Sequence, residues 1–182
     1  MMQSMPRLWL LLLLVLSTTC NRDELSLGSD EALLLPLGEA RALHQRADLH
    51  LLDGEVAAAL DDVREVLAIH FPAGSIEGEY VMLDAHGWLA RLLLSQGGED
   101  AERQALAQIE AGRKLATHDS FFRAHLESLA AEVYKARAKR LTDKAAIKEA
   151  QREELRANER ALAIDRHLQR TLLSLPDLPE EH

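Results

Sequence analysis

Apolar side chains recur every three or four residues from about residue 39 onward, which is the period of an amphipathic α-helix. The pattern predicts six helices, at about residues 39–52, 55–70, 79–95, 99–116, 121–140 and 144–173. Asp53-Gly54, Phe71-Pro72 and Gly97-Gly98 are typical ends of helices, while Asp119 or Ser120 and Thr142 or Asp143 are candidate N-caps. We therefore expect an all-α fold, a stack of about three antiparallel helix pairs with a long C-terminal capping helix.

A different pattern occupies the first twenty residues. A short segment with Arg7 as its only charge precedes an unbroken apolar run, Leu8 to Leu16, and then Ser17-Thr18-Thr19-Cys20. A helix over this run reaches only about 14–18 Å, well short of the roughly 30 Å hydrocarbon core of a bilayer. Residues 1–19 are predicted to be a signal peptide rather than a membrane span.

Cys20 is the only cysteine, and its position resembles the lipobox of bacterial lipoproteins. In that family the sulfur receives a diacylglycerol and cleavage leaves the cysteine as the first residue. Ser17 and Thr19 depart from the family, which prefers Leu three residues before the cysteine and Gly, Ala or Ser directly before it. Plain secretion and an uncleaved anchor remain alternatives. The resemblance implies a lipid-anchored protein of the bacterial cell envelope, on the outer rather than the inner membrane, with its domain facing the periplasm.

The remaining chain divides into three parts. Residues 20–37 are polar at first and include Pro36, which limits any helix through Leu35, so we expect a lipid-anchored polar tether there. Residues 38–175 form the predicted helical domain, and residues 176–182 form an acidic tail.

The first predicted helix pair resembles a tetratricopeptide repeat. The resemblance rests on Gly54–Ile69, with Gly54 at the turn and small Ala59 at the helix crossing, and on Ala47 seven residues before Gly54. Ala90 and Gly97 repeat that spacing in a second unit, and Leu129-Ala130 occupy the matching positions of a third unit. Arg46 stands where the family usually has Leu, Pro72 falls one residue late, and Arg137 replaces the third turn glycine. The small residues at 47, 90 and 130 are spaced more widely than the family's 34 residues, so the likeness over about residues 40–140 is to the general layout.

The resemblance implies a binding groove, because the first helix of each repeat lines a concave surface that receives a partner. Carried over by position, the groove would contain Arg41, His44, Asp48, Asp84, Arg91, Glu127 and Tyr134. The Lys and Asn clamp that some members use for a C-terminal carboxylate is missing, since Leu52 and Ser95 occupy Asn positions. The alternative is that these are ordinary exposed residues without a partner.

Charge is distributed unevenly. The net charge is −9, and residues 21–134 contain 21 acidic and 9 basic side chains, which argues against binding nucleic acid. The last predicted helix is basic, with a cation every fourth residue: Lys144, Lys148, Arg152, Arg156 and Arg160. A four-residue repeat drifts around a helix, and Glu149 and Glu153 can neutralise part of the row. The row is either a salt-bridged exposed face or a contact for anionic lipid headgroups or an acidic partner.

Candidate catalytic and metal-binding patterns are weak. His44 and His50, like His118 and His125, are spaced too widely for one helical zinc pair, and adjacent acidic residues such as Asp61-Asp62 point apart. We expect no enzyme activity, no cofactor and no metal. The favoured function is a membrane-tethered scaffold that binds envelope proteins or peptides. The alternatives are a structural lipoprotein acting by self-association as a homo-oligomer, and an enzyme with an unrecognised site.

Overall fold

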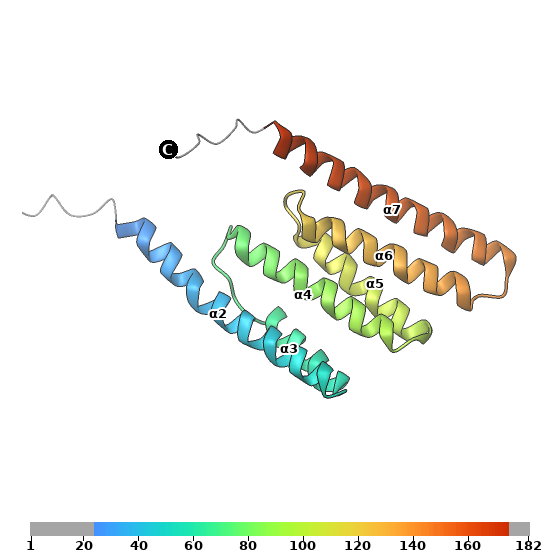
Figure 1. The fold of residues 1–182 in the computed structure, drawn as a ribbon, viewed down its shortest axis with the longest axis horizontal. Coiled ribbons are helices and arrows are strands. Elements are labelled where there is room, and N and C mark those ends of the chain that lie inside the picture. The colour runs from blue at the N-terminus through green and yellow to red at the C-terminus, as the bar shows by residue number, and fades with distance from the viewer. Residues whose placement is uncertain (1–23, 175–182) are drawn as a thin grey trace, which may run out of the picture.

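The chain folds into a stack of helical hairpins (Figure 1). The computed structural model describes residues 24–174, with side chains from residue 31 onward. Its six helices are α2 (Glu24–Leu52), α3 (Val56–Leu67), α4 (Ile76–Ser95), α5 (Gly98–Leu115), α6 (Phe121–Arg140) and α7 (Lys144–Leu173), and the described part contains no strand. The predicted all-α class is confirmed, as is the long C-terminal helix.

Three hairpins pack side by side in chain order. α2 pairs with α3, α4 with α5 and α6 with α7, and α4 lies next to both α2 and α6. α3 also packs on α4, and α5 on α6. Among the described helices α7 packs only against α6. The opposite side of α7 faces solvent, so this helix forms one end of the stack (Figure 1). The first helices of the three hairpins are therefore neighbours, and they share one face of the stack.

Small residues occupy some of the most deeply buried positions of the core. The side chains of Ala47, Ala59, Ala90 and Ala105 are essentially inaccessible to solvent. Leucine and isoleucine fill the space between these close contacts, and the largest fully buried side chains are Leu83, Ile109, Leu126 and Leu129. Ala59, Val63 and Val66 of α3 and Ala105 and Ile109 of α5 are buried at helical spacing, whereas Leu115 at the end of α5 is 42% exposed.

Local signals explain most helix boundaries. The hydroxyl of Ser75 accepts from the amide of Gly78 at 2.9 Å and begins α4. Ser120 begins α6, and the carboxylate of Asp143 accepts from the amide of Ala146 at 2.7 Å to begin α7. Gly97 ends the turn between α4 and α5 with φ 72°, a conformation that residues with a Cβ rarely adopt.

The first helix is longer than the sequence pattern predicted. α2 begins at Glu24 rather than near residue 39, and Pro36 lies inside it. Residues 24–37, expected to be an irregular tether, are therefore helical. Pro36 has no backbone N–H, so the carbonyl of Ala32 lacks the hydrogen bond that it would otherwise accept. Ala32 is exposed, so water can reach this carbonyl. Residues 20–23 and the acidic tail lie outside the described residues, as do Cys20 and the predicted signal peptide.

Candidate functional site

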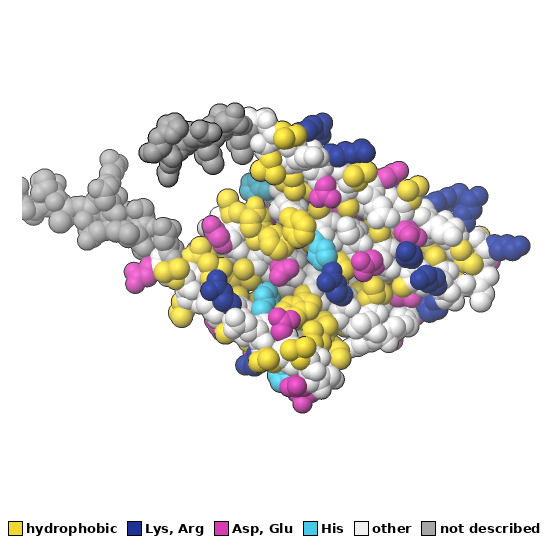
Figure 2. Space-filling model, in the orientation of Figure 1, with side chains coloured by type: hydrophobic (Ala, Val, Ile, Leu, Met, Phe, Trp, Pro, Cys, Tyr) yellow, Lys and Arg dark blue, Asp and Glu magenta, His cyan; other side chains and the backbone are white. Residues whose placement is uncertain are grey.

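One face of the stack is built from α2, α4 and α6. Two contacts between helices define it: His44 of α2 lies edge-on to Trp88 of α4, with ring centroids 5.1 Å apart, and Tyr80 of α4 lies 5.3 Å from Phe122 of α6. Hydrophobic side chains, histidines and carboxylates alternate in the middle of the face shown in Figure 2. We call this surface the α2/α4/α6 face.

Helical spacing places five of the predicted groove residues together on this face. Arg41, His44 and Asp48 follow one another at intervals of three and four along α2, and Asp84 and Arg91 are seven apart on α4. Arg41, Asp48 and Arg91 are exposed, whereas His44 and Asp84 are partly buried. The register predicted for the first two hairpins therefore brings these residues to one surface.

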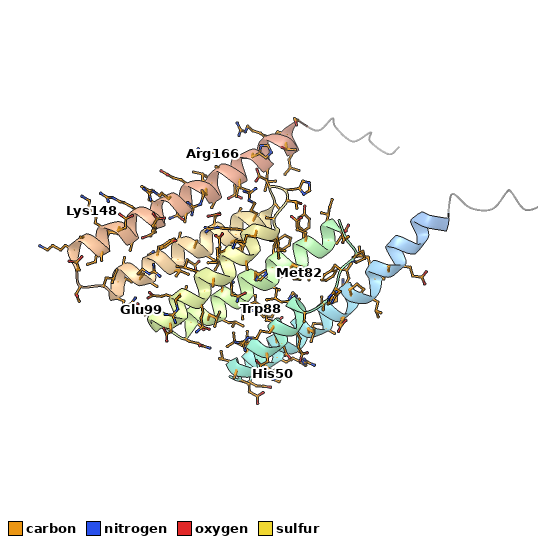
Figure 3. All side chains as sticks on the ribbon, turned by 180° about the vertical axis from the view of Figure 1, so that it is seen from behind. His50, Met82, Trp88, Glu99, Lys148 and Arg166 are labelled. Atoms are coloured by element: carbon orange, nitrogen blue, oxygen red, sulfur yellow. The ribbon has the colours of Figure 1, made fainter. Side chains whose placement is uncertain are left out.

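His44 forms the polar centre between α2 and α4. Burial lowers its pKa, and the nearby carboxylates of Asp84 and Asp48 oppose that shift without overcoming it. Its Nε2 atom is buried and has no hydrogen-bond partner among the described atoms. The imidazole is thus neutral at physiological pH and packs on Trp88, which Figure 3 shows from the opposite side.

His125 forms a second polar centre, between α4 and α6. Its Nε2 atom lies 2.9 Å from the guanidinium of Arg91, which can only donate, so His125 accepts as a neutral ring. Burial and then the charge of Arg91 lower the pKa of His125, while Asp84 and Glu132 raise it by less. The ring of Phe121 stacks parallel to this imidazole with an angle of 7° and remains 70% exposed. Phe121 is thus a large apolar ring left open to solvent beside a polar centre.

The prediction for the third hairpin was wrong in register. Glu127 is buried, and its carboxylate accepts from Arg113 of α5 at 2.6 Å and from Arg160 of α7 at 2.7 Å. It cannot line a groove. Successive helical positions rotate by about 100°, so Glu127, two residues after His125, points away from the α2/α4/α6 face.

Tyr134 lies seven residues after Glu127 and so projects from the same side of α6. Its ring packs partly against the core, with the guanidinium of Arg137 5.8 Å from the ring centroid. The residues that α6 does contribute to the α2/α4/α6 face are Phe121, Phe122 and His125. These three residues were not predicted, because the repeat resemblance set the register of α6 by Ala130.

The basic row on α7 is largely neutralised within the protein. Arg152 pairs with Glu149, Arg156 with Glu153, and Arg160 with the buried Glu127. Lys144 and Lys148, in the first turns of α7, are exposed and have no ion pair within 4.0 Å among the described residues. The five cations therefore do not form one continuous basic surface.

A second buried carboxylate holds α5 to α6. Glu102 accepts two bonds from Arg140, at 3.0 and 2.9 Å, and lies 3.6 Å from Arg137. The hydrogen bonds from Arg140 lower the pKa of Glu102 despite its burial. Charged residues of α5, α6 and α7 are thus used for internal pairing, on a different side of α6 from the residues that it contributes to the α2/α4/α6 face.

The site and fold together define a class, an all-α stack of helical hairpins with one mixed aromatic and polar face. None of the known protein families, curated proteins or solved structures that were compared matches this chain. Across the described residues, no helix is long and apolar enough to cross a membrane.

Proposed function

We propose that this protein is a non-catalytic scaffold of the bacterial cell envelope, tethered to a membrane through a lipid on Cys20, and that it binds partner proteins through the α2/α4/α6 face. The observation that carries the proposal is the exposed ring of Phe121, stacked on His125 and set beside Arg91. The proposed tether rests on the place of Cys20 after the apolar run Leu8–Leu16.

The chemistry of the face suggests how a partner would bind. Trp88, Tyr80 and Phe121 supply area that can be buried, and fixed rings lose little conformational entropy on binding. The exposed guanidinium groups of Arg41 and Arg91 can donate hydrogen bonds to a carboxylate of the partner. A helix or extended segment carrying apolar and acidic side chains fits this combination.

A second candidate function is self-association through α7. Leu155 and Leu162 are seven residues apart on its outer side and are 60% and 47% exposed. That spacing matches one heptad, so two copies of α7 could pack along this seam. A scaffold without a ligand on its α2/α4/α6 face would then act as a homo-oligomer.

One affinity experiment separates the two functions. Tagged protein is captured from solubilised envelope in three forms: wild type, Phe121→Ser, and Leu155→Ser with Leu162→Ser. We expect specific partners with the wild type and with the α7 variant, and their loss from Phe121→Ser. Capture of other copies of this chain alone, abolished by the α7 substitutions, would instead establish self-association and contradict the scaffold.

A further inference from the structure

Histidines from two different helices pack on α4 at the α2/α4/α6 face. His44 of α2 lies against Trp88, and His125 of α6 lies 2.9 Å from the guanidinium of Arg91. The carboxylate of Asp84 is near both imidazoles, and its negative charge opposes the effect of burial on the pKa of each. Histidines, cations and carboxylates occur among apolar side chains in the middle of the face in Figure 2. The face therefore carries titratable groups at contacts between its helices.

The contact between Arg91 and His125 requires a neutral ring. A guanidinium has only N–H donors, so Nε2 of His125 must supply its lone pair to accept the hydrogen bond. A proton on Nε2 would remove that lone pair and place two positive charges side by side. The ring of Phe121 stacks on this imidazole and is compatible with either charge state, because an aromatic face attracts a cation. Acid should therefore break the bond to Arg91 and leave the stacked ring in place.

The other histidine contacts differ in this respect. Nδ1 of His50 lies 2.8 Å from a carboxylate oxygen of Glu55, and Nδ1 of His86 lies 2.9 Å from the amide oxygen of Gln108. Both of these oxygens accept hydrogen bonds, so a protonated ring keeps them. Among the histidine hydrogen bonds of the described residues, only that of His125 has a partner that can do nothing but donate.

The charged groups around His125 come from two helices. Arg91 and Asp84 face it from α4, and Glu132 lies near it on α6 itself. α5 and α7 also pack on α6, but the charged side chains at those contacts pair with other residues of α6. Burial and then the charge of Arg91 lower the pKa of His125, and the two carboxylates raise it by less. The neutral ring is thus the form that the folded protein favours at neutral pH.

We propose that the bond between Arg91 and His125 is an acid-sensitive latch on the α2/α4/α6 face. When His125 takes up a proton, the bond is lost, and the exposed side chain of Arg91 turns to solvent with its donors free. The released guanidinium and the new imidazolium add positive charge beside Phe121, so a partner that presents carboxylates binds more tightly in mild acid. Those carboxylates remain charged, because they take up protons only near about pH 4. This regulation rests on the function proposed above, the binding of a partner protein by this face.

The latch can be measured on the full chain without a partner. The protein is held in detergent micelles, NMR follows carbon-13-labelled histidines from about pH 8 to about pH 5, and His125→Gln identifies the signal of residue 125. Arg91→Met keeps the length of the side chain and removes its charge and donors, so the proton affinity of His125 should rise roughly tenfold. The control is Arg41→Met, which removes an exposed arginine of the same face and should change that affinity by less than about twofold.

The consequence for binding is measured by affinity capture from solubilised envelope at about pH 8 and about pH 5. We expect the wild type to retain severalfold more of its partners in acid. His125→Gln keeps an oxygen that can accept from Arg91 but does not titrate, so this gain should be lost. His70→Gln, which removes an exposed histidine from the connection between α3 and α4, should keep the wild-type gain.

Two results would overturn the latch. An unchanged titration of His125 in Arg91→Met would show that the two side chains are not coupled. An equal pH dependence of capture in the wild type and in His125→Gln would show that the coupling does not regulate binding. If no specific partner is retained at either pH although the titration shifts, the proposed function is wrong and the coupling between Arg91 and His125 stands. Melting temperatures close to that of the wild type at neutral pH show that the comparisons concern the latch and not folding.

Discussion

At the level of single residues, methyl-sized side chains set how closely the helices approach. Ala47 of α2 and Ala59 of α3 are both completely buried where the first hairpin crosses. A small residue seven positions before a turn glycine predicts such a crossing from spacing alone, and both side chains are inaccessible to solvent. Packing density at such a crossing leaves no room for a longer side chain.

Ala59→Leu tests the crossing directly. The added atoms have no space between α2 and α3, so the substitution should lower the free energy of unfolding by about 1–3 kcal/mol. Ala57, two residues earlier on α3, is exposed, and Ala57→Leu should change stability by less than about 0.5 kcal/mol. Urea denaturation of both variants provides the comparison. Equal stability of the Ala59 variant and the wild type would show that the helices do not cross here.

Glu127 shows what the sequence could not reveal. Nothing local to α6 indicates that its partners are Arg113, fourteen residues earlier, and Arg160, thirty-three residues later. Burial alone would raise the pKa of Glu127, but the two guanidinium groups outweigh that effect and lower it below the ordinary value of 4.5. The residue is ionised and ties three helices together.

Glu127→Gln removes the charge and keeps the shape. The substitution should lower the free energy of unfolding by about 1–3 kcal/mol at neutral pH. This is less than the loss expected when a fully buried ion pair is broken, because solvent reaches both arginines. A carboxylate with a lowered pKa stabilises the fold at pH above its unfolded pKa, and this contribution disappears as the pH falls through its folded pKa. The stability difference between wild type and variant should therefore shrink below pH 4.5.

The control for this prediction is Glu110→Gln. Glu110 is 53% exposed and lies 3.5 Å from the same Arg113. Surface pairs of this kind contribute little, so we expect a change below about 0.5 kcal/mol. Urea unfolding at pH 7 and at acidic pH measures both variants. A difference for Glu127→Gln that stays constant with pH would contradict the ionised state assigned to this carboxylate.

At the level of helices, the sequence predicted which elements exist more accurately than where they begin. Five helices begin and end within about three residues of their predicted positions, since apolar spacing and capping residues act locally. α2 was the exception, because a proline at residue 36 usually limits a helix. Here Pro36 is itself buried, and burial of its ring can compensate for the missing hydrogen bond. Such compensation comes from tertiary contacts, which a local pattern does not contain.

Glycines within helices offer a second test at this level. A Cβ at residue 112 of α5 would lie 2.7 Å from Cδ1 of Leu126 and 3.3 Å from Cβ of His86. Leu126 is fully buried and cannot move aside, so Gly112→Ala should cost about 1 kcal/mol or more despite the better helix propensity of alanine. Gly38 of α2 has no atom within 4 Å of that position, and Gly38→Ala should stabilise by about 0.5–1 kcal/mol.

Thermal unfolding measures both glycine variants, and we expect their melting temperatures to change in opposite directions. The melting temperature should fall for Gly112→Ala and rise for Gly38→Ala. A rise in both would mean that α5 and α6 are packed more loosely than the distance to Leu126 indicates. The pair thus measures tertiary packing against helix propensity with the same chemical change.

At the level of the whole molecule, the two kinds of helix surface are separated. The arginines and buried glutamates of α5, α6 and α7 pair with one another, whereas α2, α4 and α6 share a face with aromatic rings and neutral histidines. The sequence placed the part of that face on α2 and α4, where the repeat resemblance is strongest. It misplaced the α6 part, because the repeat register was set by Ala130 and nothing local to α6 indicates that Glu127 pairs with Arg113 and Arg160.

The proposed lipid anchor changes what α2 does in the molecule. Because α2 is helical from Glu24, only three residues separate it from Cys20, and the stretch from Glu24 to Pro36 spans about 18 Å. An anchored chain would thus hold its hairpins away from the bilayer on a helical stalk rather than on a flexible linker. The α2/α4/α6 face would then be presented at a set height above the membrane.

Cys20→Ala tests the anchor on which this geometry depends. As Cys20 is the only cysteine, its loss should abolish incorporation of a labelled fatty acid and move the protein from the membrane fraction to the soluble fraction. A single acyl chain binds membranes only marginally, so stable retention of the wild type requires the multiple chains of a mature lipoprotein. Ser29→Ala, nine residues further along, should leave labelling and fractionation unchanged. If Cys20→Ala stays in the membrane fraction, the lipid is not the anchor, and either an uncleaved N-terminal segment or a membrane-bound partner holds the protein there.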